Sequence, residues 1–296
     1  MAILTTRIKN RLQRDYLDIM DSLPGAPKDM SWKVRWRSRY DRNPMFVVIQ
    51  DKYRVKEFAQ ARGVRSSELF HVTDKPETIP FDSLPANCFI KANHGCKWNI
   101  LRKDGEFYHY DDGDDLIGRK NFNERKLDRQ QVIDFCREWL QTTYSKREWA
   151  YSQIKPVIMV EELLEQYGGG ELIDYRCFTF KGHVAAVYVD SATYSINHQK
   201  IFVDTEWNEF KLNIKEDVPH VLPPKPDNFS EIVSAAQRLA QDFDFIRVDL
   251  FNTTRGITLG EMSVYPMGGA SLQPTMDRAF NMWLSSHWEL PSPGRN

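Results

Sequence analysis

Two carboxylates near the end of the chain, Asp249 and Glu261, are the side chains best placed to hold a metal ion. They lie on either side of a polar turn, Thr253–Gly256, which is flanked by runs of β-branched and aromatic residues and so predicts a β-hairpin. Carboxylates that face each other on a sheet repel unless a positive group joins them. Because their neighbours are apolar and carboxylate oxygens suit Mg²⁺, the hairpin suggests a Mg²⁺ site. An ordinary hairpin, whose acids face water or pair with Arg247, is the alternative.

The register of this hairpin decides whether the two acids meet. A three-residue loop over residues 254–256, with the glycine in the left-handed conformation, sets Thr253 opposite Ile257. Side chains alternate along a strand, so residues on one face follow from that register. The predicted pairs on this face are Asp249 with Glu261, and Arg247 with Ser263.

Upstream of the hairpin, four groups of polar residues suit the binding of a nucleoside triphosphate. In chain order they are Lys91, His94 with Gly95, Glu161 with Glu162, and Asp174 with Arg176. Lys91 interrupts an apolar strand, where an ammonium group needs an anionic partner. Triphosphate chemistry needs cations for the phosphates, a strand end for the base, and acids for the ribose and Mg²⁺. Each group alone is a weak signal, and their combination is more specific.

Composition sets the broad class. The chain has 296 residues, 41% hydrophobic and 27% charged, with a net charge of -1, which predicts a globular protein with a substantial core. Nothing in this balance favours nucleic acid or a membrane surface. Four cysteines without metal or redox spacing predict free thiols in a reducing compartment. No apolar run suits a secretory signal or a membrane span, so we expect a soluble, cytoplasmic protein.

Strands and helices alternate along the chain, and consecutive strands often join by tight turns, which predicts an α+β fold with antiparallel sheets. Helices are expected over residues 7–20, after Asp51, after Asp128 and from a cap at Ser230; strands are expected near 88–92, 98–101, 106–110, 155–160, 174–180 and 183–190. The acidic run 111–115 is expected to be an exposed turn, and residues 191–228 a long loop or flap.

Residues 32–40 alternate aromatic and basic side chains, so their periodicity fits both a strand and a helix. The basic residues of this segment suit a polyanion, a phosphate or an anionic lipid. The alternative is an ordinary surface on which the charges are solvated while the tryptophans pack.

Taken together, these motifs resemble the TupA-like branch of the ATP-grasp enzymes over about residues 30–285. The matching segments are Asn43-Pro44, Asp51–Tyr53, Phe89–Gly95, Val160–Leu164, Asp174–Phe178, Arg247–Asp249 and Gly260–Pro266. The resemblance implies two α+β lobes with antiparallel sheets that clamp a nucleotide. The expected parts are a short helical and basic N-terminal extension over 1–45, a first lobe over 46–155 and a second lobe with the metal hairpin over 156–296.

The resemblance also implies a role for each candidate residue. Lys91 and Lys52 would contact the nucleotide, with His94 and Gly95 in the phosphate loop; Glu161, Glu162 and Leu164 would lie along the adenine, and Asp174 at the ribose; Arg176 and Arg247 would serve the transferred phosphoryl group; Asp249, Glu261 and Ser263 would bind Mg²⁺. Ser263 stands where many relatives carry Asn.

The expected activity is that of an ADP-forming carboxylate–amine ligase that uses ATP and Mg²⁺. Its substrates would be a small-molecule carboxylate and an amine, such as an amino acid or a glycan precursor, in cell-surface polysaccharide biosynthesis or peptide modification. A phosphotransferase acting on a hydroxyl acceptor and a non-catalytic nucleotide-binding protein are the alternatives. No nucleic-acid partner is expected, and no feature of the sequence sets the oligomeric state.

Overall fold

The structure is a computed structural model that describes residues 25, 28–114, 120–145, 147–191, 199–212, 221–269 and 278–291. The helix expected over residues 7–20 lies outside these ranges. The described residues fall mainly into two compact units. One contains residues 28–41, 265–269 and 278–291, and the other contains residues 42–211 and 221–264 within the described ranges.

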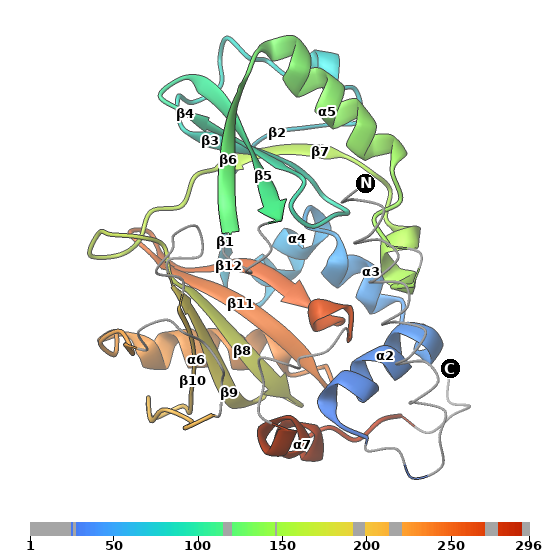
Figure 1. The fold of residues 1–296 in the computed structure, drawn as a ribbon, viewed down its shortest axis with the longest axis vertical. Helices are drawn as coiled ribbons and strands as arrows, with labels where there is room; N and C mark the ends of the chain where they lie inside the picture. Colours follow the sequence, from blue (N-terminus) through green and yellow to red (C-terminus); the bar gives the residue numbers. More distant parts are fainter. Residues whose placement is uncertain are drawn as a thin grey trace. The chain divides into compact units, whose positions relative to one another are not determined.

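The larger unit holds two six-stranded sheets, labelled in Figure 1. The first has the order β2 (Leu69–Thr73), β7 (Ile158–Glu162), β3 (Cys88–Ala92), β4 (Asn99–Lys103), β5 (Glu106–Asp114), β6 (Lys120–Leu127). The second has the order β1 (Arg65–Ser66), β12 (Gly256–Ser263), β11 (Ile246–Thr253), β8 (Asp174–Phe180), β9 (His183–Ser191), β10 (Gln199–Val203). Among the described strand pairs only β1 with β12 is parallel, so the α+β class with antiparallel sheets is confirmed.

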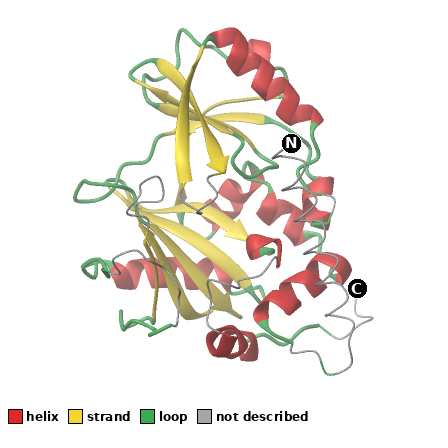
Figure 2. Ribbon diagram, in the orientation of Figure 1, coloured by secondary structure: helices red, strands yellow, loops and turns green. Residues whose placement is uncertain are grey.

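Helices flank both sheets (Figure 2). They are α3 (Met45–Gln50), α4 (Arg54–Ala61), α5 (Arg129–Gln141) and α6 (Phe229–Ala240), with 3-10 turns η1 (Pro76–Thr78) and η2 (Trp149–Gln153). Asp128 caps α5 as expected, in a reciprocal capping box with Gln131. The cap expected at Asp51 lies two residues too early, because Tyr53 takes the cap position of α4, although the Asp51 carboxylate accepts the backbone N–H groups of Tyr53 and Arg54.

The cap expected at Ser230 is wrong. Helix α6 begins one residue earlier, at Phe229, and Asn228 takes the cap position. Phe229 is buried at 1% exposure, so the apolar stripe of the helix starts at that residue and draws Ser230 into the first turn.

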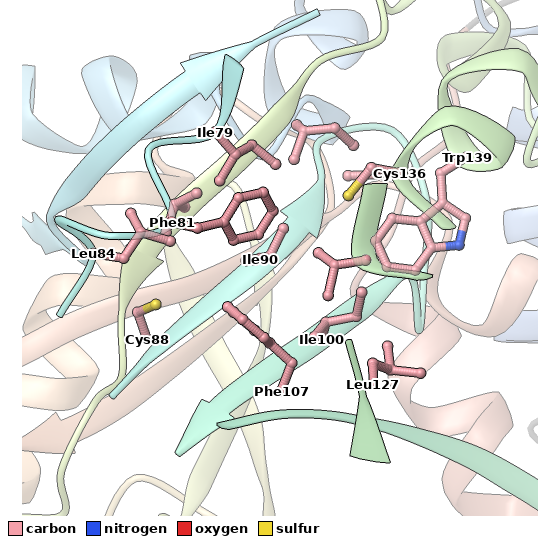
Figure 3. Packing of buried hydrophobic residues seen from close by; sticks show 14 residues of the cluster. Ile79, Phe81, Leu84, Cys88, Ile90, Ile100, Phe107, Leu127, Cys136 and Trp139 are labelled. Atoms are coloured by element: carbon pink, nitrogen blue, oxygen red, sulfur yellow. The ribbon is translucent and has the colours of Figure 1, made fainter. Parts of the chain in front are cut away.

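A compact apolar cluster holds α5 against the first sheet (Figure 3). Its members are buried side chains from β3, β4, β5, β6, α5, β7 and the segment before β3; among those labelled are Ile79, Phe81, Ile90, Ile100, Phe107 and Trp139. Cys88 and Cys136 belong to it as free thiols, and burial raises their pKa to about 11 and about 12. These two cysteines therefore act as packing groups rather than as reactive thiols.

Three expectations about local structure are corrected. The acidic segment 111–114 is not a turn, because β5 continues through Asp114 and pairs with β6. Residues 191–228 are not all loop, because β10 pairs with β9. Strand β7, which was expected at the start of the second lobe, lies in the first sheet between β2 and β3.

In the smaller unit, the aromatic and basic segment over residues 32–40 is helical rather than a strand. Residues Met30–Tyr40 form helix α2, which is capped by Asp29. The unit also contains η3 (Pro266–Gly269) and α7 (Arg278–Ser286). Arg37 is fully buried and lies over the ring of Trp288, 4.3 Å from its centroid. Lys33 donates to the carbonyl oxygens of Ser285 and Trp288. Arg37 and Lys33 therefore make contacts within the smaller unit. No helix among the described residues has the length and apolarity needed to cross a membrane.

Candidate active site

One buried carboxylate in the first sheet holds two ammonium groups. Glu161 in β7 lies with one oxygen 2.6 Å from Lys91 Nζ and the other 2.8 Å from Lys56 Nζ. Ser67 Oγ donates to the second oxygen at 2.9 Å. Burial alone would raise the pKa of Glu161, but the two lysines outweigh it and lower the pKa to about 2. These four residues are called the lysine cluster below.

Lys56 is a member that the sequence reasoning missed. Lys52 was expected to be the second nucleotide lysine, yet it precedes α4 and its Nζ lies 3.2 Å from Glu261 Oε1 on the other sheet. Lys56 lies four residues further on, inside α4, where burial lowers its pKa despite the partly compensating charge of Glu161. The four-residue spacing after Lys52 is the only signal that could have indicated it.

His94 and Gly95 shape the loop after β3. His94 is buried, and its Nε2 lies 3.1 Å from the carbonyl oxygen of Trp139 and 3.3 Å from that of Thr142, at the end of α5. Burial lowers its pKa, which favours the neutral ring. A Cβ on Gly95 would lie 2.2 Å from a ring atom of Trp98, so this position requires glycine for packing. The imidazole thus ties the loop to α5.

The second sheet carries the predicted hairpin, and its turn differs from the prediction. Thr253 pairs with Gly256 rather than with Ile257, so the loop has two residues, 254–255. A one-residue bulge at Gly260 then shifts the register, which restores Asp249 opposite Glu261 and Arg247 opposite Ser263. The predicted pairs are therefore present for a different reason.

Gly260 is required by its surroundings. A Cβ at this position would lie 2.4 Å from a ring carbon of Phe251 on the neighbouring strand. The bulge that aligns the two acids thus depends on an aromatic ring that covers the glycine.

Carboxylates and guanidinium groups alternate across the middle of this sheet. Arg247 binds Asp249 through two hydrogen bonds of 2.7 and 2.6 Å. Arg176 lies 2.7 Å from Asp174, 2.7 Å from Asp190 and 3.9 Å from Asp249. The acid cluster is defined as Lys52, Asp174, Arg176, Asp190, Arg247, Asp249 and Glu261.

The acids of this cluster titrate unlike Glu161. Burial, together with the nearby Asp249, raises the pKa of Asp174 to about 7. Burial also raises the pKa of Asp249, although Arg247 opposes this shift. The pKa of Glu261 is lowered, because Lys52 and Arg247 together outweigh its burial. Four carboxylates thus share three cations, and additional positive charge at Asp249 would stabilise their ionised forms.

The arrangement fits a divalent cation only in part. No three His, Cys, Asp or Glu side chains gather as a complete ligand set among the described residues. Asp249 and Glu261 face each other in register, with Ser263 two residues further along β12. Mg²⁺ is commonly held by one or two carboxylates together with phosphate oxygens and water, so this pair suits a metal that arrives with a nucleotide.

The remaining candidates lie around the end of β7. Glu162 pairs with Arg65 at 2.6 Å and with Arg255 at 3.0 Å, and despite burial its pKa is lowered by the backbone N–H of Glu68 together with these two arginines. Its side chain therefore does not join that of Glu161. Leu164 is partly buried in the segment after β7, which reaches the hairpin turn through a hydrogen bond from Thr254 N–H to the carbonyl oxygen of Glu165.

Comparisons with known proteins identify a matching family and several similar structures. The family model described as TupA-like ATPgrasp matches residues 32–287. None of the curated proteins compared with the chain matches it. Similar solved structures include a D-alanine–D-alanine ligase from Bacillus anthracis complexed with ATP (13% identity, TM-score 0.43, 82% of this chain and 65% of that one). Another is the D-alanine–D-alanine ligase from Helicobacter pylori (16%, 0.44, 82% and 62%).

A third similar structure is a RiPP-associated ATP-grasp ligase from Chryseobacterium gregarium in complex with ADP and a leader and core peptide. It shares 12% identity at a TM-score of 0.39, over 97% of this chain and 68% of that one. The chain spans less than two thirds of the length of either D-alanine–D-alanine ligase.

Proposed function

The chain belongs to the TupA-like ATP-grasp family, and from that premise we propose that it is an ADP-forming carboxylate–amine ligase. The observation that carries the proposal is the pair of charge clusters: two lysines on one buried carboxylate, and two acids facing each other beside two arginines. A triphosphate presents many negative oxygens to the first cluster and a metal-bound phosphate to the second.

Lys56 and Lys91 would bind phosphate oxygens, while Glu161 and Ser67 keep both ammonium groups in place. Asp249 and Glu261, with Ser263 beside them, would hold Mg²⁺, which neutralises negative charge on the β- and γ-phosphates. Lys52 would keep Glu261 oriented in the absence of the metal.

Arg176 and Arg247 would stabilise the transferred phosphoryl group. A carboxylate oxygen of the substrate attacks the γ-phosphorus, and the bond to the β-phosphate oxygen breaks to release ADP. An amine then attacks the carbonyl carbon of the acyl phosphate, phosphate leaves and the amine nitrogen loses a proton. Both arginines sit among carboxylates that raise their pKa, so they remain charged throughout.

The substrates we propose are small molecules: a carboxylate, and an amine from an amino acid, peptide or cell-surface glycan precursor. D-alanine and short peptides are the first pools to test, because the similar structures include a D-alanine–D-alanine ligase and a ligase in complex with a leader and core peptide. A cytoplasmic site of action suits the proposed use of ATP and Mg²⁺, and the free thiols, three of them buried, support it.

Hydroxylamine trapping tests this function. The protein is incubated with ATP, Mg²⁺ and separate pools of amino acids, peptides and glycan precursors, and then with hydroxylamine, which captures acyl phosphates as hydroxamates. ADP together with a hydroxamate supports the ligase. ADP with a stable phosphoester would instead assign a hydroxyl phosphotransferase, and nucleotide binding without turnover in any pool would contradict catalysis.

A further inference from the structure

A cavity of about 570 Å³ lies in the larger unit, away from both charge clusters. Its walls come from the residues after α4, from β1, from one side of α6 and from the hairpin turn, and they include Arg65, Ser230, Ser234, Arg238, Arg255 and Ile257. None of the residues of the lysine and acid clusters lines it. Its volume lies within the range of small-molecule sites.

Guanidinium groups outnumber carboxylates in the lining itself. Three arginines line the cavity, Arg65, Arg238 and Arg255, against a single acid, Glu231. Arg238 uses Nη1 to bind Ser234 Oγ at 2.9 Å and Nε to bind the carbonyl oxygen of Arg62 at 3.2 Å. The Nε of Arg65 is buried and has no hydrogen-bond partner among the described residues. A buried donor without a partner is costly, and rotation of the guanidinium group towards an anion in the cavity would remove that cost.

Two of the guanidinium groups are fixed by a carboxylate that is not part of the lining. Glu162 lies 2.6 Å from Arg65 Nη2 and 3.0 Å from Arg255 Nη1, and Glu68 lies 3.3 Å from the same Arg255 nitrogen. These contacts order both side chains before any ligand arrives, which reduces the entropy that binding would cost.

Helix α6 adds neutral donors to the same wall. Ser230, Ser234 and Arg238 are spaced four residues apart and so share one face of this twelve-residue helix. Ser230 lies in the first turn, where the helix dipole is positive. Hydroxyl donors beside guanidinium groups are the combination that phosphate and carboxylate groups bind.

We propose that this cavity is a second binding site, which takes a small anionic ligand carrying phosphate or carboxylate groups. Binding engages the free donors of Arg65, Arg238 and Arg255.

Calorimetric titration at constant ionic strength tests the site, with pyrophosphate and citrate as separate probes. The protein is first saturated with the non-hydrolysable analogue AMPPNP without Mg²⁺, which both probes would chelate, and the titrations are repeated on the Lys56→Met/Lys91→Met variant without nucleotide. The proposal expects saturable 1:1 binding of at least one probe in both settings. The probe that binds more tightly identifies phosphate or carboxylate as the preferred group.

The variants Arg238→Met and Arg65→Met should weaken this binding about tenfold or more, the scale of one charge-assisted hydrogen bond. Arg137→Met on α5, an exposed arginine outside the cavity, is the matched control and should bind as wild type does. If Arg238→Met does not fold, Ser234→Ala replaces it, with thermal unfolding as the check. Absence of saturable binding, or binding that survives the cavity variants, overturns the proposal; neither result bears on catalysis.

Discussion

The lysine cluster and the acid cluster lie in the same unit and have opposite charge balances. In the first, two ammonium groups share one carboxylate, and the pKa of Glu161 is lowered to about 2. In the second, four carboxylates share two guanidinium groups and one ammonium group, and the pKa of Asp174 is raised to about 7. One cluster thus has surplus positive charge for an anion, and the other has surplus negative charge for a cation.

This difference fits our proposal that the two sheets divide the binding of one ligand. Magnesium-bound ATP is an anion that carries a cation at one end, and it matches both surpluses at once. Cation-rich groups without the acids would bind any polyanion, and acids without the lysines would bind any divalent metal. The predictions below separate the clusters by removing charge from one at a time.

The largest effect is expected from the acids of the hairpin. Asp249→Asn or Glu261→Gln should lower turnover roughly 10²–10³-fold, the scale of losing one electrostatic contact in a transition state. Asp82→Asn, which removes an exposed carboxylate, is the matched control. Steady-state ADP release measures the effect, and wild-type rates in either hairpin variant would exclude the proposed metal role.

Replacing the lysines is expected to have a smaller effect, which changes the KM for ATP rather than the turnover rate. Lys56→Met or Lys91→Met should raise the KM for ATP roughly 10- to 100-fold, since a charge-assisted hydrogen bond contributes about 1.5–3 kcal/mol. The exposed Lys155→Met serves as control. A fall in kcat with no change in KM would show that these groups do not bind the nucleotide in the ground state.

Replacing the bulge glycine tests the geometry of the acid cluster alone. Gly260→Ala should destabilise the fold by about 1–3 kcal/mol, because the new methyl group overlaps the ring of Phe251. Gly256→Ala meets no atom within 4 Å and is strained only by its φ of 101°, so it separates overlap from backbone strain. Urea unfolding measures both, and equal losses would contradict the packing argument.

The smallest effect is the pH dependence of the lysine cluster. The folded pKa of Glu161, about 2, lies below its usual value of 4.5, so its ionised form stabilises the fold above pH 4.5. This contribution is lost as pH falls from 4.5 towards 2. The free-energy difference between wild type and Glu161→Gln should therefore shrink across that range. A difference that grows on acidification would have the wrong sign.

The sequence predicts the fold class and part of the lysine cluster, but not all of that cluster. The fold class and most strands follow from alternation and turn residues, and Lys91 with Glu161 is visible as charge at the ends of apolar strands. Lys56 lies in a helix, and its four-residue spacing from Lys52 is the only feature of the sequence that marks it. Its role depends on α4 packing near β7, which is a tertiary fact.

Strand register is the second feature that could not be predicted from the sequence. The hairpin β8–β9 has a bulge between Phe178 and Thr179, which sets Asp174 opposite Asp190. A plain two-residue turn at Lys181-Gly182 would have set Asp174 opposite Val189 and hidden Asp190 from the cluster. The metal hairpin was predicted correctly at Asp249 only because an assumed longer loop and the real bulge at Gly260 shift the register by the same one residue.

The central claim is that both clusters bind one metal-bound triphosphate. Calorimetric titration with AMPPNP, with and without Mg²⁺, tests it most directly when wild type is compared with an Asp249→Asn/Glu261→Gln variant. The account predicts that Mg²⁺ tightens binding to wild type and that the variant loses this gain while keeping the metal-free affinity. An equal gain from Mg²⁺ in both proteins would contradict it.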